Sequence, residues 1–196
     1  MYRHLFVTFF IILLLPLFST LSLAENEKIK FKEMRLGIGY AFGNLKLENS
    51  TPDYEAIPLS AQFGFNINKL FGLNGHKGDI QLAIEPYIGH ISKPEHNVEF
   101  GLGLFFKYAY PLFDKISPYV EFGAGPMYLG INTYEQEENG FNFISQGGGG
   151  IQYFIAENKT INLGYRFRHI SNADFKDNRN AGINTHMITA GISMFY

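Results

Sequence analysis

The chain has 196 residues, 46% of them hydrophobic, so it is long enough for one domain with a full core and too short for two large ones. Sixteen Lys and Arg residues stand against 18 Asp and Glu residues, and this near balance excludes a general attraction to nucleic acid or to anionic surfaces. The absence of Cys excludes a disulfide scaffold, a thiolate metal site and a Cys nucleophile, while 21 Gly, 12 Tyr and 20 Phe with only 17% charged residues favour strands over surface helices.

The first residues are typical of an export signal. Arg3 and His4 form a short basic start, an apolar stretch follows from Leu5 to Phe18, and the segment ends at Ala24 in the small-residue pattern that a signal peptidase cleaves. The alternative is a retained membrane anchor, but the apolar stretch is short for a spanning helix. We therefore expect residues 1–24 to be a signal peptide and residues 25–196 to form one domain.

Beyond this segment, apolar residues alternate with small or polar ones at a period of two, which predicts strands. In the clearest example, Phe100, Leu102 and Leu104 share one face, while Gly101 and Gly103 share the other. The expected strands cover about residues 35–43, 57–67, 80–88, 98–110, 118–131, 141–155, 160–171 and 184–196. We expect an all-β protein, an eight-stranded antiparallel transmembrane β-barrel with its apolar face towards lipid.

A soluble β-sandwich also alternates, so the two folds must be compared. Arg166 and Arg168 lie on the polar face of the seventh expected strand and require a polar lumen. The terminal aromatic Tyr196 closes an alternating strand in the manner of an outer-membrane assembly signal, which a sandwich does not need. Eight strands argue against a pore, because side chains fill an interior of that width. The Gly147–Gly150 run lacks the Lys-Ser/Thr of a phosphate loop and is expected to bend a strand.

An N-terminus in the periplasm makes the odd-numbered strands run outward. The expected extracellular loops are then short, at about residues 49–55, 91–96, 132–140 and 172–183, and the expected periplasmic turns lie at about 68–78, 111–117 and 156–159. Short loops leave little surface for the alternative function, that of a non-enzymatic barrel with a structural or surface-interaction role.

Four polar residues interrupt the apolar face near the extracellular end. His169 and Ser171 share the parity of the outward residues of their strand, and Asn184 and His186 do the same on the next strand. Adjacent strands lie about 4.8 Å apart, so His169, Ser171 and Asn184 are within reach of one another. A hydroxyl, an imidazole and an amide are the parts of a hydrolase. The alternative is a girdle of polar side chains at the membrane interface, where their cost is low.

The segments around these residues carry a family likeness. Residues 164–173 (Gly-Tyr-Arg-Phe-Arg-His-Ile-Ser-Asn-Ala) and 180–184 (Asn-Ala-Gly-Ile-Asn) resemble the signature of the outer-membrane lipid A 3-O-deacylase family (PagL). The resemblance implies a barrel that hydrolyses the ester at position 3 of lipid A, with its active site on the lipid-facing surface. It implies that Ser171 is the nucleophile, His169 the general base and Asn172 a contributor to the oxyanion hole.

One position departs from the family pattern, because Asn184 stands where the founding members carry a Glu that orients the His, and the preceding loop has one extra residue. An amide oxygen can fix the tautomer of His169 but cannot balance imidazolium charge. Asp174 and Asp177 are alternative partners, and Lys176 and Arg179 are candidates for binding lipid A phosphates.

No cofactor or metal is expected. His90 and His96 flank a turn, but two His residues without an acid cluster do not predict a metal site. The sequence thus predicts a serine esterase of the outer membrane that acts on lipid A from the extracellular side, and it leaves open whether the protein forms homodimers.

Overall fold

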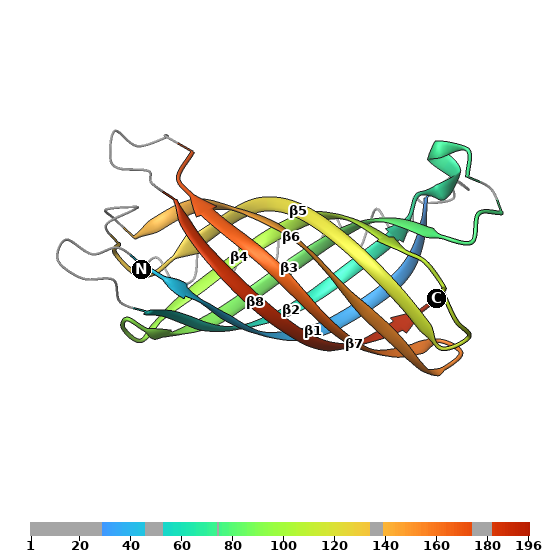
Figure 1. The fold of residues 1–196 in the computed structure, drawn as a ribbon. Coiled ribbons are helices and arrows are strands. Elements are labelled where there is room, and N and C mark those ends of the chain that lie inside the picture. The colour runs from blue at the N-terminus through green and yellow to red at the C-terminus, as the bar shows by residue number, and fades with distance from the viewer. Residues whose placement is uncertain (1–28, 46–52, 74, 134–138, 174–181) are drawn as a thin grey trace, which may run out of the picture.

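The computed structural model describes residues 29–45, 53–73, 75–133, 139–173 and 182–196. The expected signal peptide lies outside these residues. The described part forms eight strands and one short 3₁₀ helix (Figure 1). In chain order the elements are β1 (Lys30–Asn44), β2 (Asp53–Asn66), η1 (Asn68–Phe71), β3 (Asp79–Lys93), β4 (Asn97–Ala109), β5 (Ile116–Leu129), β6 (Gly140–Ala156), β7 (Lys159–Ser171) and β8 (Ile183–Phe195).

Every strand pairs antiparallel with its sequence neighbours, and β1 pairs with β8 to close the sheet into a barrel. The strands are 13 to 17 residues long, more than the roughly 9–11 residues that a tilted strand needs to cross a bilayer. Figure 1 shows them strongly tilted to the barrel axis. The expected eight-stranded antiparallel barrel is confirmed.

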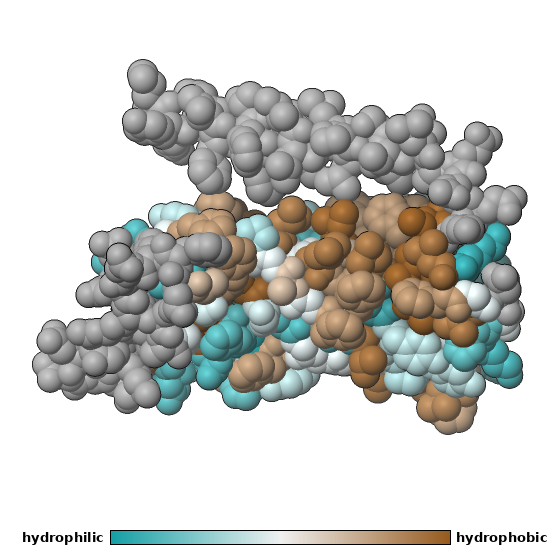
Figure 2. Space-filling view, turned by 90° about the horizontal axis from the view of Figure 1, so that it is seen from above, coloured by the Kyte–Doolittle hydropathy of each residue, from teal (hydrophilic) through white to brown (hydrophobic). Residues whose placement is uncertain are grey.

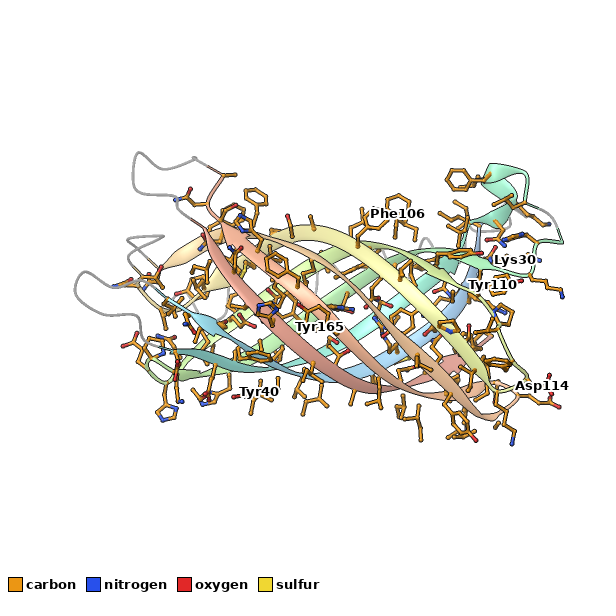
Figure 3. The ribbon with its side chains drawn as sticks, viewed as in Figure 1. Lys30, Tyr40, Phe106, Tyr110, Asp114 and Tyr165 are labelled. Atoms are coloured by element: carbon orange, nitrogen blue, oxygen red, sulfur yellow. The ribbon has the colours of Figure 1, made fainter. Side chains whose placement is uncertain are left out.

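The outward face of the barrel is apolar. Leu104 and Ile192 are 49% and 58% exposed, whereas Gln62 and Arg166 point inward and are 2% and 4% exposed. Figure 3 shows Tyr40 and Phe106 pointing away from the barrel, and hydrophobic side chains gather over the middle of the face in Figure 2. Among the described residues, no helix is long and apolar enough to cross a membrane. An exposed apolar band on tilted strands is the surface of a transmembrane barrel.

β1, β2 and β3 are longer than the alternation indicated. β1 begins at Lys30 rather than near Leu36, because inward Glu33 and Arg35 find partners in the lumen and let the strand continue. Residues 53–55, 91–93, 140 and 183, expected in loops, belong to strands. Ile67, expected to face outward, is 3% exposed and lies between β2 and η1.

The two ends of the barrel differ. The β2–β3, β4–β5 and β6–β7 connections lie at one end, called here the turn end, on the right in Figure 1. The expected long turn at 68–78 contains η1, which ends at Gly72 with φ of 70°. The other four connections lie at the opposite end, called here the loop end.

A network of ion pairs fills the lumen. Arg166 donates to Glu85 at 2.5 Å and to Glu121 at 2.8 Å, and Arg35 also donates to Glu121 at 2.8 Å. Arg168 binds both carboxylate oxygens of Glu99 at 2.8 Å. The expectation that Arg166 and Arg168 point into a polar lumen is therefore confirmed.

Glu33 forms a second centre of this network. Its carboxylate accepts hydrogen bonds from Lys107 at 2.5 Å, Ser193 at 2.7 Å, Gln152 at 2.8 Å and Gln81 at 3.1 Å. A cavity of about 30 Å³ remains beside Arg35, Glu85 and Arg166, room for water but not for a lipid.

Candidate active site on the outer face

Strand pairing brings the predicted residues into two adjacent rows near the loop end. In the first row, Ser145 of β6, His169 of β7 and Asn184 of β8 are direct neighbours. In the next row towards the loop end, Phe143 of β6 faces Ser171 of β7. The side chains of Ser145 and Asn184 are exposed and those of His169 and Ser171 are half-buried, while Arg168 and Ile170 point inward. The polar residues thus lie on the lipid-facing side, as the parity predicts.

His169 and Asn184 form the central contact of the site. Their Nδ1 and Oδ1 atoms lie 2.7 Å apart. An amide oxygen can only accept a hydrogen bond, so Nδ1 carries the proton and donates it. Nε2 of the neutral ring is then left with a lone pair, which is the form that a general base requires.

Gly182 fixes the imidazole from the loop side. It has φ of 72°, and a Cβ atom there would lie 2.4 Å from Cε1 and 3.1 Å from Nε2 of His169. The backbone of Gly182 is therefore the surface on which the ring rests. A residue with a side chain would both strain the backbone and displace the ring.

Two serines flank His169, and the ring position discriminates between them. The β7–β8 pairing ends with Ile170 opposite Ile183, so Gly182 continues the row of Ser171. Because Cε1 and Nε2 lie beside Gly182, the tip of the ring is directed to that row and away from Ser145 on β6. Ser171 is therefore the better placed hydroxyl.

Asn172 faces the other way. Its side chain is 3% exposed and lies on the inward side of the chain, beyond the last residue of β7. Ala173 follows with φ of 54°, which turns the backbone away from the strand direction. A contribution of Asn172 to chemistry outside the barrel must therefore come from its main-chain N–H, which directly follows Ser171.

The remaining predicted residues fall into two groups. Lys176, Arg179, Asp174 and Asp177 lie outside the described residues, and their roles stay predictions. His90 and His96 contact each other, with 3.2 Å between Nε2 and Nδ1, and the described residues contain no group of three or more His, Asp or Glu side chains suited to a metal.

Sequence reasoning did not assign a role to Gly182, Ser145 or Tyr165. The Gly within the second segment of the motif was a signal for the first, since glycine is common where φ is positive. Ser145 becomes a neighbour of His169 only through the β6–β7 register. Tyr165 binds Nδ1 of His186 at 2.6 Å, a diagonal contact across β7 and β8 that no spacing within one strand reveals.

Comparison with known proteins supports one family. The model of the family described as lipid A 3-O-deacylase (PagL) matches residues 55–193. Comparison with curated proteins gives no match at the sequence level.

Two solved structures share the fold. The crystal structure of Neisserial surface protein A has a TM-score of 0.62 at 15% identity, covering 87% of this chain and 100% of its own. The crystal structure of the outer membrane enzyme PagL has a TM-score of 0.55 at 17% identity, covering 81% of this chain and 97% of its own. The fold is thus shared with barrels of differing description, whereas the family model covers most of the sequence, including the His169, Ser171 and Asn184 positions. The chain belongs to the lipid A 3-O-deacylase (PagL) family.

Proposed function

We propose that this protein is a serine esterase of the outer membrane that removes the acyl chain esterified at position 3 of lipid A. The observation that carries the proposal is the 2.7 Å contact between His169 Nδ1 and Asn184 Oδ1 on the lipid-facing surface, one row from Ser171. It leaves Nε2 able to accept a proton, with the hydroxyl of Ser171 in the adjacent row. A polar side chain that only forms part of a girdle at the membrane interface does not require the tautomer with the proton on Nδ1.

The acylation half-reaction uses this geometry directly. Ser171 Oγ attacks the ester carbonyl carbon as its proton passes to His169 Nε2. The main-chain N–H of Asn172 is the proposed donor to the oxyanion that forms on the carbonyl oxygen. When the tetrahedral intermediate collapses, the carbon–oxygen bond to the sugar breaks, and His169 returns the proton to the sugar oxygen. Ser171 then carries the acyl chain as an ester.

Deacylation repeats these steps with water. His169 takes a proton from water, the resulting hydroxide oxygen bonds to the acyl carbon, and the bond to Ser171 Oγ breaks. The Ser171 oxygen regains its proton from His169, and a free fatty acid leaves. Neither acylation nor deacylation consumes a cofactor. The net reaction converts the ester and one water molecule into the sugar alcohol and a free fatty acid.

The outer face of β6 supports an acyl substrate. Beside His169 its outward residues are Ser145, Gly147 and Gly149, while large side chains stand on both sides, such as Phe122 on β5 and Phe167 on β7. A Cβ atom at Gly147 would meet nothing within 4 Å. This strip of small residues is about 13 Å long, at about 3.3 Å per residue, and it accommodates the cleaved chain along the barrel wall.

The same surface supports a location. The proposed site lies near the loop end of the apolar band, which favours an extracellular position for that end, where lipid A is the acyl lipid of the outer leaflet. Lys176 and Arg179, in the connection between β7 and β8, are the proposed contacts to its phosphates.

The test is hydrolysis by the refolded mature barrel in detergent micelles that contain purified lipid A, followed by mass spectrometry. The parent protein should release one fatty acid from position 3. Ser171→Ala and His169→Ala should each lower the rate by about 10⁶-fold, because the residues of such a site act as a unit. Ser145→Ala is the matched control and should keep most of the parental rate, since alanine preserves the strip of small residues and the ring tip is directed away from β6.

The result that would overturn the proposal is appreciable hydrolysis by Ser171→Ala, or loss of activity in Ser145→Ala in its place. Absence of hydrolysis by a folded, heat-modifiable parent barrel would favour the alternative, a non-enzymatic barrel with a structural or surface-interaction role.

A further inference from the structure

A second polar pair lies on the lipid-facing surface, next to the proposed catalytic residues. The phenol oxygen of Tyr165 and Nδ1 of His186 are 2.6 Å apart. His186 is exposed and directly opposite Phe167 on β7, one row further from the loop end than the His169–Asn184 row. Tyr165 is 44% exposed and lies on the visible face of the barrel in Figure 3. Both polar groups therefore lie within the apolar band rather than at its rim.

The Tyr165–His186 pair carries one polar hydrogen that is not used in the hydrogen bond between the two residues. The phenol and the neutral imidazole carry one polar hydrogen each, and one of the two is taken by the contact between them. If the phenol donates to Nδ1, then Nε2–H remains, and if Nδ1 donates, then the phenol O–H remains. Among the described residues, no other side chain makes a hydrogen bond to this pair. In either tautomer the pair thus presents a donor to the lipid.

The surroundings make a lipid-side acceptor necessary. The rings of Phe42, Phe167 and Tyr165 lie 5.7, 5.7 and 5.9 Å from the ring of His186, measured between centroids. Hydrocarbon offers no acceptor, and an unsatisfied polar group there is costly. An acceptor carried by a bound lipid would satisfy this donor.

The position of His186 along the barrel indicates which chemical group of the lipid can accept the hydrogen bond. His186 lies two residues beyond Asn184, about 6.8 Å further along the strand, on the side away from the headgroup region. Phosphates and sugar hydroxyls belong to the headgroup level, whereas acyl chains carry ester and amide carbonyls below it. His186 also faces Phe42 of β1, while the strip of small residues lies on the opposite flank of β7. The acceptor thus belongs to a different acyl chain from the one that is cleaved.

We propose that Tyr165 and His186 form a substrate-positioning site that donates a hydrogen bond to the carbonyl of a neighbouring, uncleaved acyl chain of lipid A. This inference takes lipid A from the proposed function and deepens it. It gives the protein a means to distinguish a lipid that carries several acyl chains on one sugar from a lipid with fewer acyl carbonyls in reach. The rings of Phe42 and Phe167 hold that chain from both sides.

The test measures binding rather than hydrolysis, with Ser171→Ala as the background so that no substrate is consumed. Dissociation constants are measured in mixed micelles for lipid A and for a two-chain phosphatidylethanolamine. Adding Tyr165→Phe and His186→Phe together keeps both aromatic rings but removes both polar hydrogens of the pair, and it should weaken lipid A binding by about three- to tenfold, the worth of one neutral hydrogen bond. Binding of phosphatidylethanolamine should not change. Tyr165→Phe combined with His186→Gln restores an N–H donor and should recover most of the affinity.

Tyr153→Phe is the matched control, since it removes a phenol from the outer face at the turn end of β6. It should leave both dissociation constants unchanged. Equal lipid A affinity in the Tyr165→Phe, His186→Phe double variant and its parent would overturn the proposal, as would an equal loss for both lipids, which marks a general contact to lipid carbonyls. If this pair contributes to lipid A binding but the protein with Ser171 intact hydrolyses no lipid A, the proposed function is refuted and the binding site is not.

Discussion

Asn184 is the residue at which this chain departs from the family pattern, and its contact with His169 shows what an amide does there. The amide oxygen accepts the Nδ1 hydrogen at 2.7 Å and so selects the tautomer with a basic Nε2. A carboxylate would do the same and would in addition stabilise the positive charge that the ring acquires in the transition state. The amide thus retains orientation and gives up charge compensation.

The first prediction separates these two contributions. Asn184→Ala should slow lipid A hydrolysis by as much as about 10⁴-fold, because the tautomer is no longer fixed. Asn184→Glu should match or exceed the parental rate, since a carboxylate adds charge compensation at the same position. Rates are measured on barrels that remain heat-modifiable. Equal rates for parent, Ala and Glu forms would exclude Asn184 from the site and direct attention to Asp174 and Asp177.

The second prediction concerns Gly182. Gly182→Ala should lower activity by about 10²-fold, the usual effect of a displacement of about 1 Å in a catalytic group, because its Cβ occupies the place of the His169 ring. Gly72→Ala is a matched control: Gly72 also has positive φ, 70°, but nothing lies within 4 Å of its Cβ position. It should show the same small loss of stability with full activity. Similar kinetics for both variants would mean that backbone strain, and not the ring contact, is what matters at Gly182.

At the scale of the strand, β6 is shaped by its four consecutive glycines. Its pairing with β5 and with β7 continues through Gly147–Gly150 without a shift in register. A Cβ atom at Gly148 would lie 1.9 Å from the Tyr165 carbonyl oxygen, and one at Gly150 would lie 2.2 Å from that of Leu163. Glycine is therefore required for close approach to β7, the strand that carries His169 and Ser171.

The third prediction compares two neighbouring glycines of this run. Gly148→Ala should destabilise the barrel by about 1–3 kcal/mol, because the added carbon collides with backbone that cannot move away. Gly147→Ala should stay within about 0.5 kcal/mol of the parent, since its Cβ position is open. Urea unfolding in lipid micelles, followed by heat-modifiability on gels, gives both values. Equal destabilisation by the two substitutions would show that contact with β7 does not set the need for glycine, because Gly→Ala by itself lowers the entropy of the unfolded chain and stabilises the fold.

The alternation in the sequence was sufficient to predict the strands, their facing and the outward position of His169 and Ser171, because a period of two leaves only two possible faces. It did not reveal that β1 starts at Lys30, since the charge at Glu33 looks like that of a loop residue until its lumen partners are known. Contacts between strands, such as Gly182 beneath His169 or Tyr165 with His186, depend on register and backbone conformation. A single sequence does not specify these, and they complete the site.

At the scale of the whole molecule, the barrel separates a charged interior from a reactive exterior. Glu121 is central to the interior, because both Arg35 and Arg166 donate to its carboxylate at 2.8 Å. The charged groups thus gather in the lumen, while the side chains of His169, Ser171 and Asn184 lie on the outer wall of β7 and β8.

The fourth prediction tests this division. Glu121→Leu should destabilise the folded barrel by about 3–5 kcal/mol, the usual cost of leaving buried cationic groups without their partner. Val120→Leu changes the neighbouring, lipid-facing residue of β5, which is 59% exposed, and should have almost no effect. Urea midpoints in lipid micelles measure both changes. A stable Glu121→Leu barrel would show that water in the lumen compensates the guanidinium groups.

The carboxylate of Glu33 has a consequence for how the barrel assembles. Its partners Gln81, Lys107, Gln152 and Ser193 come from β3, β4, β6 and β8, and the last of these lies 160 positions further along the chain. In an open sheet within lipid this carboxylate and Lys107 would both face hydrocarbon, which is prohibitive for charged groups. Neutralisation of the interior is thus tied to the meeting of the first strand with the last. Insertion and closure should therefore occur as one concerted event, without a long-lived sheet whose edges are still apart.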